Sequence, residues 1–321
     1  MRKPEKLLLV CMFLYLWSIS GCTPSPKGVT NGRIVFQALR DGVFDLYSIN
    51  PDGSSQEKLL KYKADDPNRG SNYAPIASPN GKKVAFESMR DGNYEIYVYD
   101  IENRIQINLT KNRADDHSPA WSPDGKRIAF VSARDSILLD YRRDIWTNNI
   151  YVMDTDGSNI KRITRDNTTN AYGGLSWSPD GNSLAVAISS LSPYGLFYSA
   201  GIHILNLHNS SIIELPYNSA QIQGNPKWSP DGKYILYTIS GSKFIQIYRM
   251  NADGTNQIDL SKDPTTYDID PSWSPDGKYI VFSSNSAGNY YVYIMDADGS
   301  NRKQLTKGKG EDTFATWLPE P

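Results

Sequence analysis

The stretch Trp121-Ser122-Pro123-Asp124-Gly125-Lys126 decides the fold of this 321-residue chain, because the pattern recurs along the sequence. Copies or partial copies begin at five other positions: Ala77, Trp177, Trp228, Trp273 and Trp317. Neighbouring starting points are 44 to 56 residues apart. A period of about 40 to 50 residues is typical of propellers and related repeat arrays. We therefore expect one array of similar units.

Each unit is predicted to contain four strands. The segment that carries Trp121 is one strand. Three short runs follow it, Arg127–Val131, Ile150–Asp154 and Ile163–Thr164. They are rich in β-branched and aromatic residues, which is typical of strands. Ser-Pro-Asp-Gly suits a tight turn between strands, because Pro fixes φ at the second turn position and Gly allows the exit. No stretch keeps an apolar period of about 3.6 residues, so the sequence predicts an all-β chain.

The two ends of the array complete each other. The first strand-like run, Gly32–Phe36, has no Trp segment before it, and the last Trp segment, Phe314–Trp317, has no run after it. The sequence therefore predicts a six-bladed β-propeller of four-stranded antiparallel blades over residues 32–319. In this arrangement the C-terminal strand is the innermost strand of the first blade, which removes the free edges of an open array.

These repeats resemble the TolB-like propeller repeat. Its pattern, Pro-x-Trp-Ser-Pro-Asp-Gly-Lys followed by a strand and Ile-Tyr-x-Met-Asp, is matched almost letter for letter by residues 119–126 and 150–154. The resemblance covers residues 32–319 and implies that the Trp strand is innermost in each blade. TolB itself is a periplasmic protein of the Tol-Pal envelope system with an α/β domain ahead of its propeller. Only about ten residues separate Cys22 from the first strand-like run, so we expect a TolB relative without this domain.

The amino terminus has the pattern of a bacterial export signal. A basic start precedes the apolar run Leu7–Trp17, which is too short to span a bilayer. The following Ile19–Cys22 resembles the lipobox of bacterial lipoproteins, in which the Cys is acylated. We expect a signal peptide over residues 1–21, lipidation of Cys22 and a tether over residues 22–31. The alternative is an ordinary secretory signal that happens to contain Cys22.

A processed lipobox would anchor the protein to a bacterial membrane, either the outer membrane facing the periplasm or the cell surface. The lipid is the expected membrane contact, since 34 Lys and Arg against 35 Asp and Glu give a net charge of −1. That balance provides no field to attract nucleic acid or an anionic bilayer.

Catalytic signatures are mostly missing from the sequence. It contains no Gly-x-Ser-x-Gly elbow, no phosphate-binding loop and no His-Glu-x-x-His. There are only three His residues. We therefore predict no catalytic residue, no metal and no cofactor.

One position in each unit is predicted to lead into the innermost strand at the channel mouth, opposite the Ser-Pro-Asp-Gly turns. The residues at this position are Asn72, Asp116, Tyr172, Gln223, Asp268 and Asp312, and His117 lies beside the second. Carboxylates around one mouth suit a cation or the basic side chains of a partner. The alternative is that each Asp binds local backbone or an Arg of the neighbouring blade. The Arg-Asp pairs that begin at Arg40, Arg90 and Arg134 are expected to pair across blades.

Two long connections carry a second set of candidates. They span residues 137–148 and 191–200 and contain Tyr141, Trp146, Tyr194, Phe197 and Tyr198. Such rings suit a protein interface or a sugar-stacking platform on the rim. The alternative is that they pack onto their own blades.

Three functions remain open from the sequence. The first is a monomeric, lipid-anchored scaffold that binds an envelope protein or peptide through its channel mouth. The second is a carbohydrate-binding or carbohydrate-active propeller, acting as a lyase or hydrolase through channel Asp and His residues. The third is a propeller cap that has lost a serine hydrolase domain. Fold alone does not choose among them.

Overall fold

The computed structural model describes residues 32–60, 71–135, 138–140, 145–146, 148–164, 170–191, 197–217, 221–241 and 243–321. Within these ranges it excludes the side chains of residues 138–140, 145–146, 170–172, 190–191 and 197–199. The described backbone contains strands and turns and no helix. Accordingly, it contains no helix long and apolar enough to cross a membrane.

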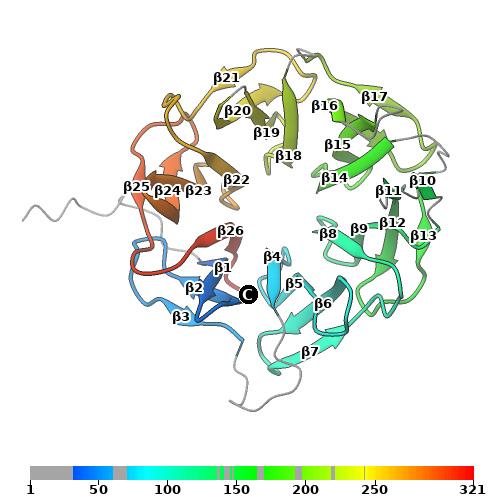
Figure 1. The fold of residues 1–321 in the computed structure, drawn as a ribbon, viewed down its shortest axis with the longest axis horizontal. Coiled ribbons are helices and arrows are strands. Elements are labelled where there is room, and N and C mark those ends of the chain that lie inside the picture. The colour runs from blue at the N-terminus through cyan, green and yellow to red at the C-terminus, as the bar shows by residue number, and fades with distance from the viewer. Residues whose placement is uncertain are drawn as a thin grey trace, which may run out of the picture.

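The described strands form six blades around a common centre (Figure 1). Blade 1 contains β26 (Asp312–Leu318), β1 (Arg33–Arg40), β2 (Val43–Ile49) and β3 (Glu57–Lys58). Blade 2 contains β4 (Asn72–Ala77), β5 (Lys83–Ser88), β6 (Glu95–Asp100) and β7 (Ile105–Asn108). Blade 3 contains β8 (Asp116–Trp121), β9 (Arg127–Ser132), β12 (Asn149–Asp154) and β13 (Lys161–Arg162).

The remaining blades follow the same order. Blade 4 contains β14 (Asn170–Trp177), β15 (Ser183–Leu191), β16 (Phe197–Asn206) and β17 (Ile212–Glu214). Blade 5 contains β18 (Ile222–Trp228), β19 (Tyr234–Ser240), β20 (Ile245–Asn251) and β21 (Ile258–Asp259). Blade 6 contains β22 (Asp268–Trp273), β23 (Tyr279–Ala287), β24 (Asn289–Asp296) and β25 (Lys303–Gln304). A separate hairpin, β10 (Leu138–Asp140) with β11 (Ile145–Trp146), lies between β9 and β12 in the sequence.

The all-β propeller prediction is confirmed. Within each blade the strands pair antiparallel, and a single parallel bridge between Ala200 and Ile222 joins blades 4 and 5. The last strand lies in the same sheet as the first, because β26 pairs with β1 from Arg33 opposite Leu318 to Ala38 opposite Asp312. Chain ends far apart in sequence therefore share blade 1.

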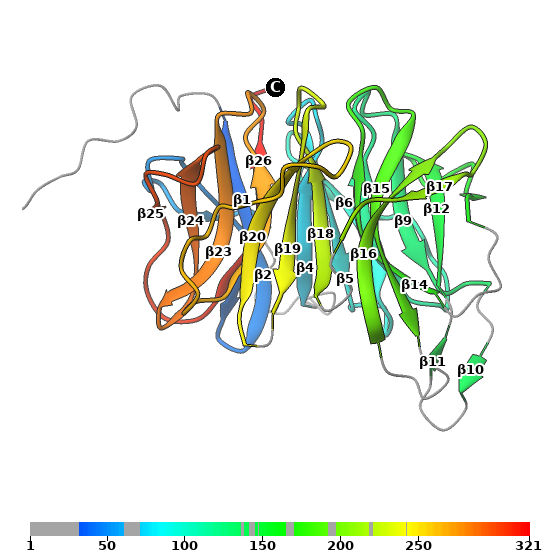
Figure 2. The same cartoon turned by 90° about the horizontal axis from the view of Figure 1, so that it is seen from above.

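The molecule has two unlike faces (Figure 2). We call the end that carries the Ser-Pro-Asp/Asn-Gly turns the turn face; the turns span residues 78–81, 122–125, 178–181, 229–232 and 274–277. The carboxyl terminus lies on this face. We call the opposite end, where the inner strands β4, β8, β14, β18, β22 and β26 begin, the mouth face. The β10–β11 hairpin projects from the mouth face.

The repeated motif joins neighbouring blades. Trp121 Nε1 donates to the carbonyl of Ile76 at 3.1 Å, and Trp177 Nε1 donates to the carbonyl of Ala120 at 3.0 Å. Within the turn, Ser122 Oγ donates to Asp124 at 2.6 Å. The recurrence of the motif is thus accounted for by its hydrogen bonds within the turn and between neighbouring blades, and no catalytic role is needed to account for it.

Candidate functional site

Of the predicted channel-mouth residues whose side chains the structure describes, all but His117 lie inside the blades. Five of these side chains are 0 or 1% exposed: Asn72, Asp116, Gln223, Asp268 and Asp312. The expectation that they line the open mouth is therefore corrected. The side chain of Tyr172 lies outside the described part of the chain.

An arginine of the same blade binds each of the three buried carboxylates. The pairs are Arg40 with Asp312, Arg134 with Asp116 and Arg302 with Asp268, with N–O distances from 2.6 to 3.1 Å. Arg90 likewise donates to Asn72 Oδ1 at 2.7 Å. The expected pairing across blades is corrected, because each arginine folds back along its own sheet and lies over aromatic rings of that sheet.

These ion pairs compensate for the burial of the three carboxylates. Burial raises the pKa of Asp116 and of Asp312, and the neighbouring hydroxyl and arginine groups oppose that rise. A buried charge is tolerated only when it is paired and hydrogen-bonded. The pairs therefore fix the starts of the inner strands β8, β22 and β26.

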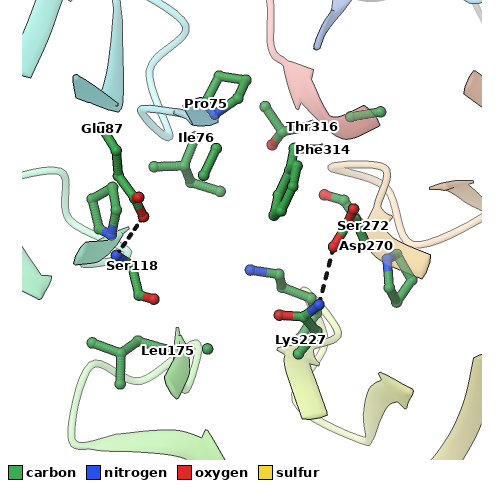
Figure 3. A pocket seen from close by; sticks show the side chains of 16 residues that line it. Pro75, Ile76, Glu87, Ser118, Leu175, Lys227, Asp270, Ser272, Phe314 and Thr316 are labelled. Atoms are coloured by element: carbon green, nitrogen blue, oxygen red, sulfur yellow. Dashed lines mark hydrogen bonds between the residues drawn. The ribbon is translucent and has the colours of Figure 1, made fainter. Parts of the chain in front are cut away.

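His117 is the exception, because its side chain is 36% exposed. The Nδ1 of His117 lies 3.1 Å from Glu87 Oε2. Glu87 Oε1 accepts the backbone N–H of Ser118 at 2.7 Å, as Figure 3 shows. Burial lowers the pKa of His117, but the hydrogen bond and charge of Glu87 outweigh it, so the pKa is raised. The pair is held on the mouth side of blades 2 and 3.

A ring of six left-handed residues lines the channel, and the sequence reasoning missed it. The ring contains Ala74, Ser118, Gly174, Asn225, Asp270 and Phe314, each two residues after a predicted mouth position, with φ from +45° to +55°. The inner strand changes register at each of these points. For a non-glycine residue this conformation costs about 1–3 kcal/mol and tends to occur at functional sites. A proline follows four of the six, which is a sequence signal for a bulge in a strand.

The ring encloses a cavity of about 100 Å³. One half of the ring has small residues, namely Ala74, Ser118 and Gly174, and the other half carries Asn225, Asp270 and Phe314. Gly174 suits its position, because a Cβ there would lie only 3.1 Å from the Cα of Asn225. The cavity is therefore lopsided, with space on one side and polar and aromatic groups on the other.

Asn225, Lys227 and Asp270 form a polar cluster on the side of the cavity that has the larger ring residues. Figure 3 labels Lys227 and Asp270 there. Asn225 Nδ2 donates to Asp270 Oδ1 at 3.0 Å. Asp270 is 8% exposed and its Oδ2 is buried without a hydrogen-bond partner. Burial raises the pKa of Asp270 to about 7, opposed by the charge of Lys227, the backbone N–H of Phe314 and the Asn225 amide. Burial lowers the pKa of Lys227, and the charge of Asp270 opposes that shift.

The channel widens toward the turn face into a space of about 420 Å³. Its lining includes the repeated tryptophans Trp121, Trp177, Trp228, Trp273 and Trp317, together with prolines of the turns. Lys227 and Leu175 line both spaces, so they belong to one channel. The polar cluster thus lies where the wide part meets the narrow part.

The mouth face carries an aromatic arc, which we define as Phe44, Tyr73, Tyr94 and His117. Neighbouring ring centroids in the arc are 5.4, 5.8 and 4.5 Å apart, and all four side chains are partly exposed. The arc crosses blades 1, 2 and 3. A further pair, Phe244 with Tyr267, lies on the mouth side of blades 5 and 6, with centroids 5.3 Å apart.

The predicted rim aromatics cannot be placed as side chains. Tyr141 and Tyr194 lie outside the described residues, and Trp146, Phe197 and Tyr198 lie in strands whose side chains there are not described. Among the described residues, no group of three or more His, Cys, Asp or Glu side chains is arranged to hold a metal ion.

Comparisons with known proteins agree with this geometry. Residues 66–175 match the TolB beta propeller domain. A TolB homologue of Chlorobium luteolum is 32% identical over 82 residues, which cover 26% of this chain and 17% of that protein. An uncharacterized protein of Agrobacterium fabrum is 29% identical over 171 residues, covering 51% of this chain and 52% of that protein. This chain thus spans about half or less of these curated relatives.

A solved structure shows the same fold. The crystal structure of TolB from Acinetobacter baumannii superposes with a TM-score of 0.72 at 24% identity, covering 90% of this chain and 67% of that one. The repeat motif, the blade order and these likenesses together identify the architecture. The chain is a TolB-like β-propeller.

Proposed function

We propose that this protein is an exported, lipid-anchored scaffold that binds a segment of a partner protein at the mouth face of its channel. The observation that carries the proposal is the aromatic arc, which runs from Phe44 of blade 1 to His117 of blade 3. Tyr and Phe provide large contact area with few rotatable bonds and are enriched at protein interfaces. The likeness to TolB supports a protein partner at this level of detail.

The mouth face is preorganised by buried interactions. The buried Arg–Asp pairs fix the starts of three inner strands, and Glu87 fixes both His117 and the bulge at Ser118. A surface that is already ordered loses less conformational entropy when a partner binds. This favours recognition of a protein segment by a preformed site.

The carbohydrate-active alternative loses its expected acids. Asp116, Asp268 and Asp312 are each 0% exposed and paired with arginine. General acid or base catalysis needs a carboxyl group within hydrogen-bond reach of the substrate. Of the residues suggested for that role, His117 alone is partly exposed.

The anchor is a separate part of the proposal. It rests on the resemblance of Ile19–Cys22 to a lipobox, since these residues lie outside the described structure. Mass spectrometry of the membrane-extracted protein should find an acylated amino-terminal Cys22. The Cys22→Ser variant should be released from the membrane fraction, and a wild-type protein with unmodified Cys22 would contradict the anchor.

Site-directed photocrosslinking tests the binding surface. A photoreactive phenylalanine analogue is placed at Tyr94 in the arc or, as a control, at Ile213, which is 62% exposed on the outer strand β17. We expect a discrete protein adduct from position 94 that is lost when Tyr73→Ala is added, and none from position 213. Equal adducts from both positions, or none from position 94, would contradict the proposed site.

A further inference from the structure

We propose that Lys227 and Asp270 form a subsite for a primary carboxamide, the end group of an Asn or Gln side chain, inside the channel. The inference deepens the proposed function and rests on it only for the identity of the segment that carries the carboxamide. The site is the narrow cavity beneath the mouth, not the aromatic arc on the rim.

The geometry directs both groups into one space. Lys227 comes from β18 and Asp270 from β22, and both side chains point into the cavity between Leu175, Ser118 and Phe314 (Figure 3). The opposite wall has the small residues Ala74 and Gly174. A cavity of about 100 Å³ has room for several water molecules, so a side-chain end group fits.

Both groups have unused hydrogen-bonding capacity. Asp270 Oδ2 is buried and has no hydrogen-bond partner in the described structure. Lys227 Nζ, with three N–H donors, makes no hydrogen bond or ion pair with any residue that the structure describes, although it senses the charge of Asp270. Buried polar groups are normally satisfied, so the open acceptor of Asp270 calls for a ligand or water, and the donors of Lys227 lie on the same cavity.

Asp312 shows why the position matters. Its Oδ2 also lacks a partner, but the residue is 0% exposed and does not line the cavity. Asp270 lies on the cavity wall, where a ligand can reach it. Its left-handed backbone, with φ of +52°, is part of the bulge that places it on the wall.

A carboxamide matches the pair in hydrogen bonding and in charge. Its carbonyl accepts from Lys227 Nζ, and its N–H donates to Asp270 Oδ2. Above pH 7, where Asp270 is charged, the pair of Lys⁺ and Asp⁻ is neutral, so binding a neutral carboxamide buries no net charge. A carboxylate would bury a net negative charge or need an extra proton, and an ammonium group would bury a net positive charge.

Small probes test the subsite on the purified full-length protein. Acetamide is titrated while the Lys227 and Asp270 side-chain signals are followed by NMR, with acetate as an anion of the same size and methylammonium as a smaller cation. A probe of four non-hydrogen atoms binds only weakly, so dissociation constants in the millimolar range are expected. We expect saturable binding of acetamide that is tighter than that of either charged probe.

Two variants and one control test the assignment. Lys227→Met and Asp270→Leu should each weaken acetamide binding about tenfold, because each removes a hydrogen bond to a charged group. Lys233→Met, at a lysine whose side chain is 72% exposed on the turn face, should leave binding unchanged. Tighter binding of acetate or methylammonium, or unchanged acetamide binding in both channel variants, would overturn the proposal.

A measurement on the wild-type protein needs no variant to fold. Acetamide bound between the two groups should give nuclear Overhauser contacts from its methyl protons to the Phe314 ring, and their absence at saturation would overturn the proposal. The probes need no partner protein. Acetamide binding without a crosslink at Tyr94 would therefore count against the proposed function alone, and the reverse result against the carboxamide subsite alone.

Discussion

Asp268 and Asp270 lie two residues apart on β22 and differ in exposure and in hydrogen-bond partners. Asp268 is 0% exposed and receives two hydrogen bonds from Arg302, at 2.6 and 2.7 Å. Asp270 is 8% exposed and lies on the channel wall. Its Oδ1 accepts from Asn225 and the backbone N–H of Phe314 also acts on the carboxyl group, but Oδ2 has no hydrogen-bond partner. The difference teaches that a buried carboxylate with complete partners holds the fold, and one with incomplete partners on a cavity is a candidate for binding.

Breaking the satisfied pair should have the largest effect. Arg302→Met leaves Asp268 charged and buried, which is expected to lower the free energy of unfolding by about 3 kcal/mol. Urea denaturation followed by Trp fluorescence measures the change. Lys278→Met serves as the control, because it breaks an exposed pair with Asp276 and should cost less than about 0.5 kcal/mol. Equal effects of the two variants would remove the distinction between the buried and the exposed pair.

The incomplete hydrogen bonding of Asp270 should make the stability of the protein depend on pH. Burial raises the pKa of Asp270 to about 7 in the folded protein, above its unfolded value of 3.8, so the folded state binds the extra proton between these values. Its contribution to stability is complete below pH 4 and is lost as pH rises through 7. Between pH 5 and pH 8 we expect the wild type to lose roughly 2 kcal/mol more unfolding free energy than Asp270→Asn.

Three neighbouring titratable groups must be controlled in that measurement. Lys227 faces Asp270, the pKa of Tyr290 is raised mainly by burial and slightly by Asp270, and His117 titrates in the same range with a raised pKa. The comparison between wild type and Asp270→Asn cancels the part due to His117. Parallel stability curves for the two proteins from pH 5 to pH 8 would show that Asp270 has an ordinary pKa.

Two tryptophans of the repeat also differ in whether a buried polar group has a hydrogen-bond partner, and we expect a smaller effect on stability. Trp121 Nε1 donates to a carbonyl of the preceding blade, whereas Trp228 Nε1 is buried without a partner. Trp121→Phe should therefore cost about 1 kcal/mol more than Trp228→Phe, because only the first variant loses a hydrogen bond. Thermal unfolding of both variants measures the difference. A larger loss for Trp228→Phe would contradict the hydrogen-bond assignment.

Backbone strain in the channel ring should give the smallest effect. Ala74 has φ of +45°, so Ala74→Gly relieves strain and should raise the unfolding free energy by about 0.5 kcal/mol. Ala77→Gly, on the same strand without a positive φ, should lower it instead. Destabilisation by both substitutions, measured in urea, would argue against strain at the ring.

Much of the fold could be predicted from the sequence, because the repeat is written in turn residues and alternating strands. The spacing of the Trp-Ser-Pro-Asp-Gly copies indicated the blades, and the resemblance placed the Trp strand innermost. Local sequence patterns determine such features, so they are readable without coordinates.

The candidate site could be predicted only in outline. The positions of Asp116, Asp268 and Asp312 were found, but their burial depended on arginines whose direction the sequence does not reveal. Asp270 was missed because the bulge shifts the alternation of β22, which turns its side chain to the channel. The Pro that follows it was the available signal, since a proline inside a strand marks an edge or a bulge.

The most direct measurement is the pKa of the Asp270 carboxyl group, followed by ¹³C NMR with and without acetamide. We predict a midpoint near pH 7 in the free protein, in line with the burial of this group. We also predict a lower midpoint when acetamide is bound, because a donated hydrogen bond favours the charged form. A midpoint near 4 that acetamide does not change would contradict both the incomplete partnering of Asp270 and its role in binding.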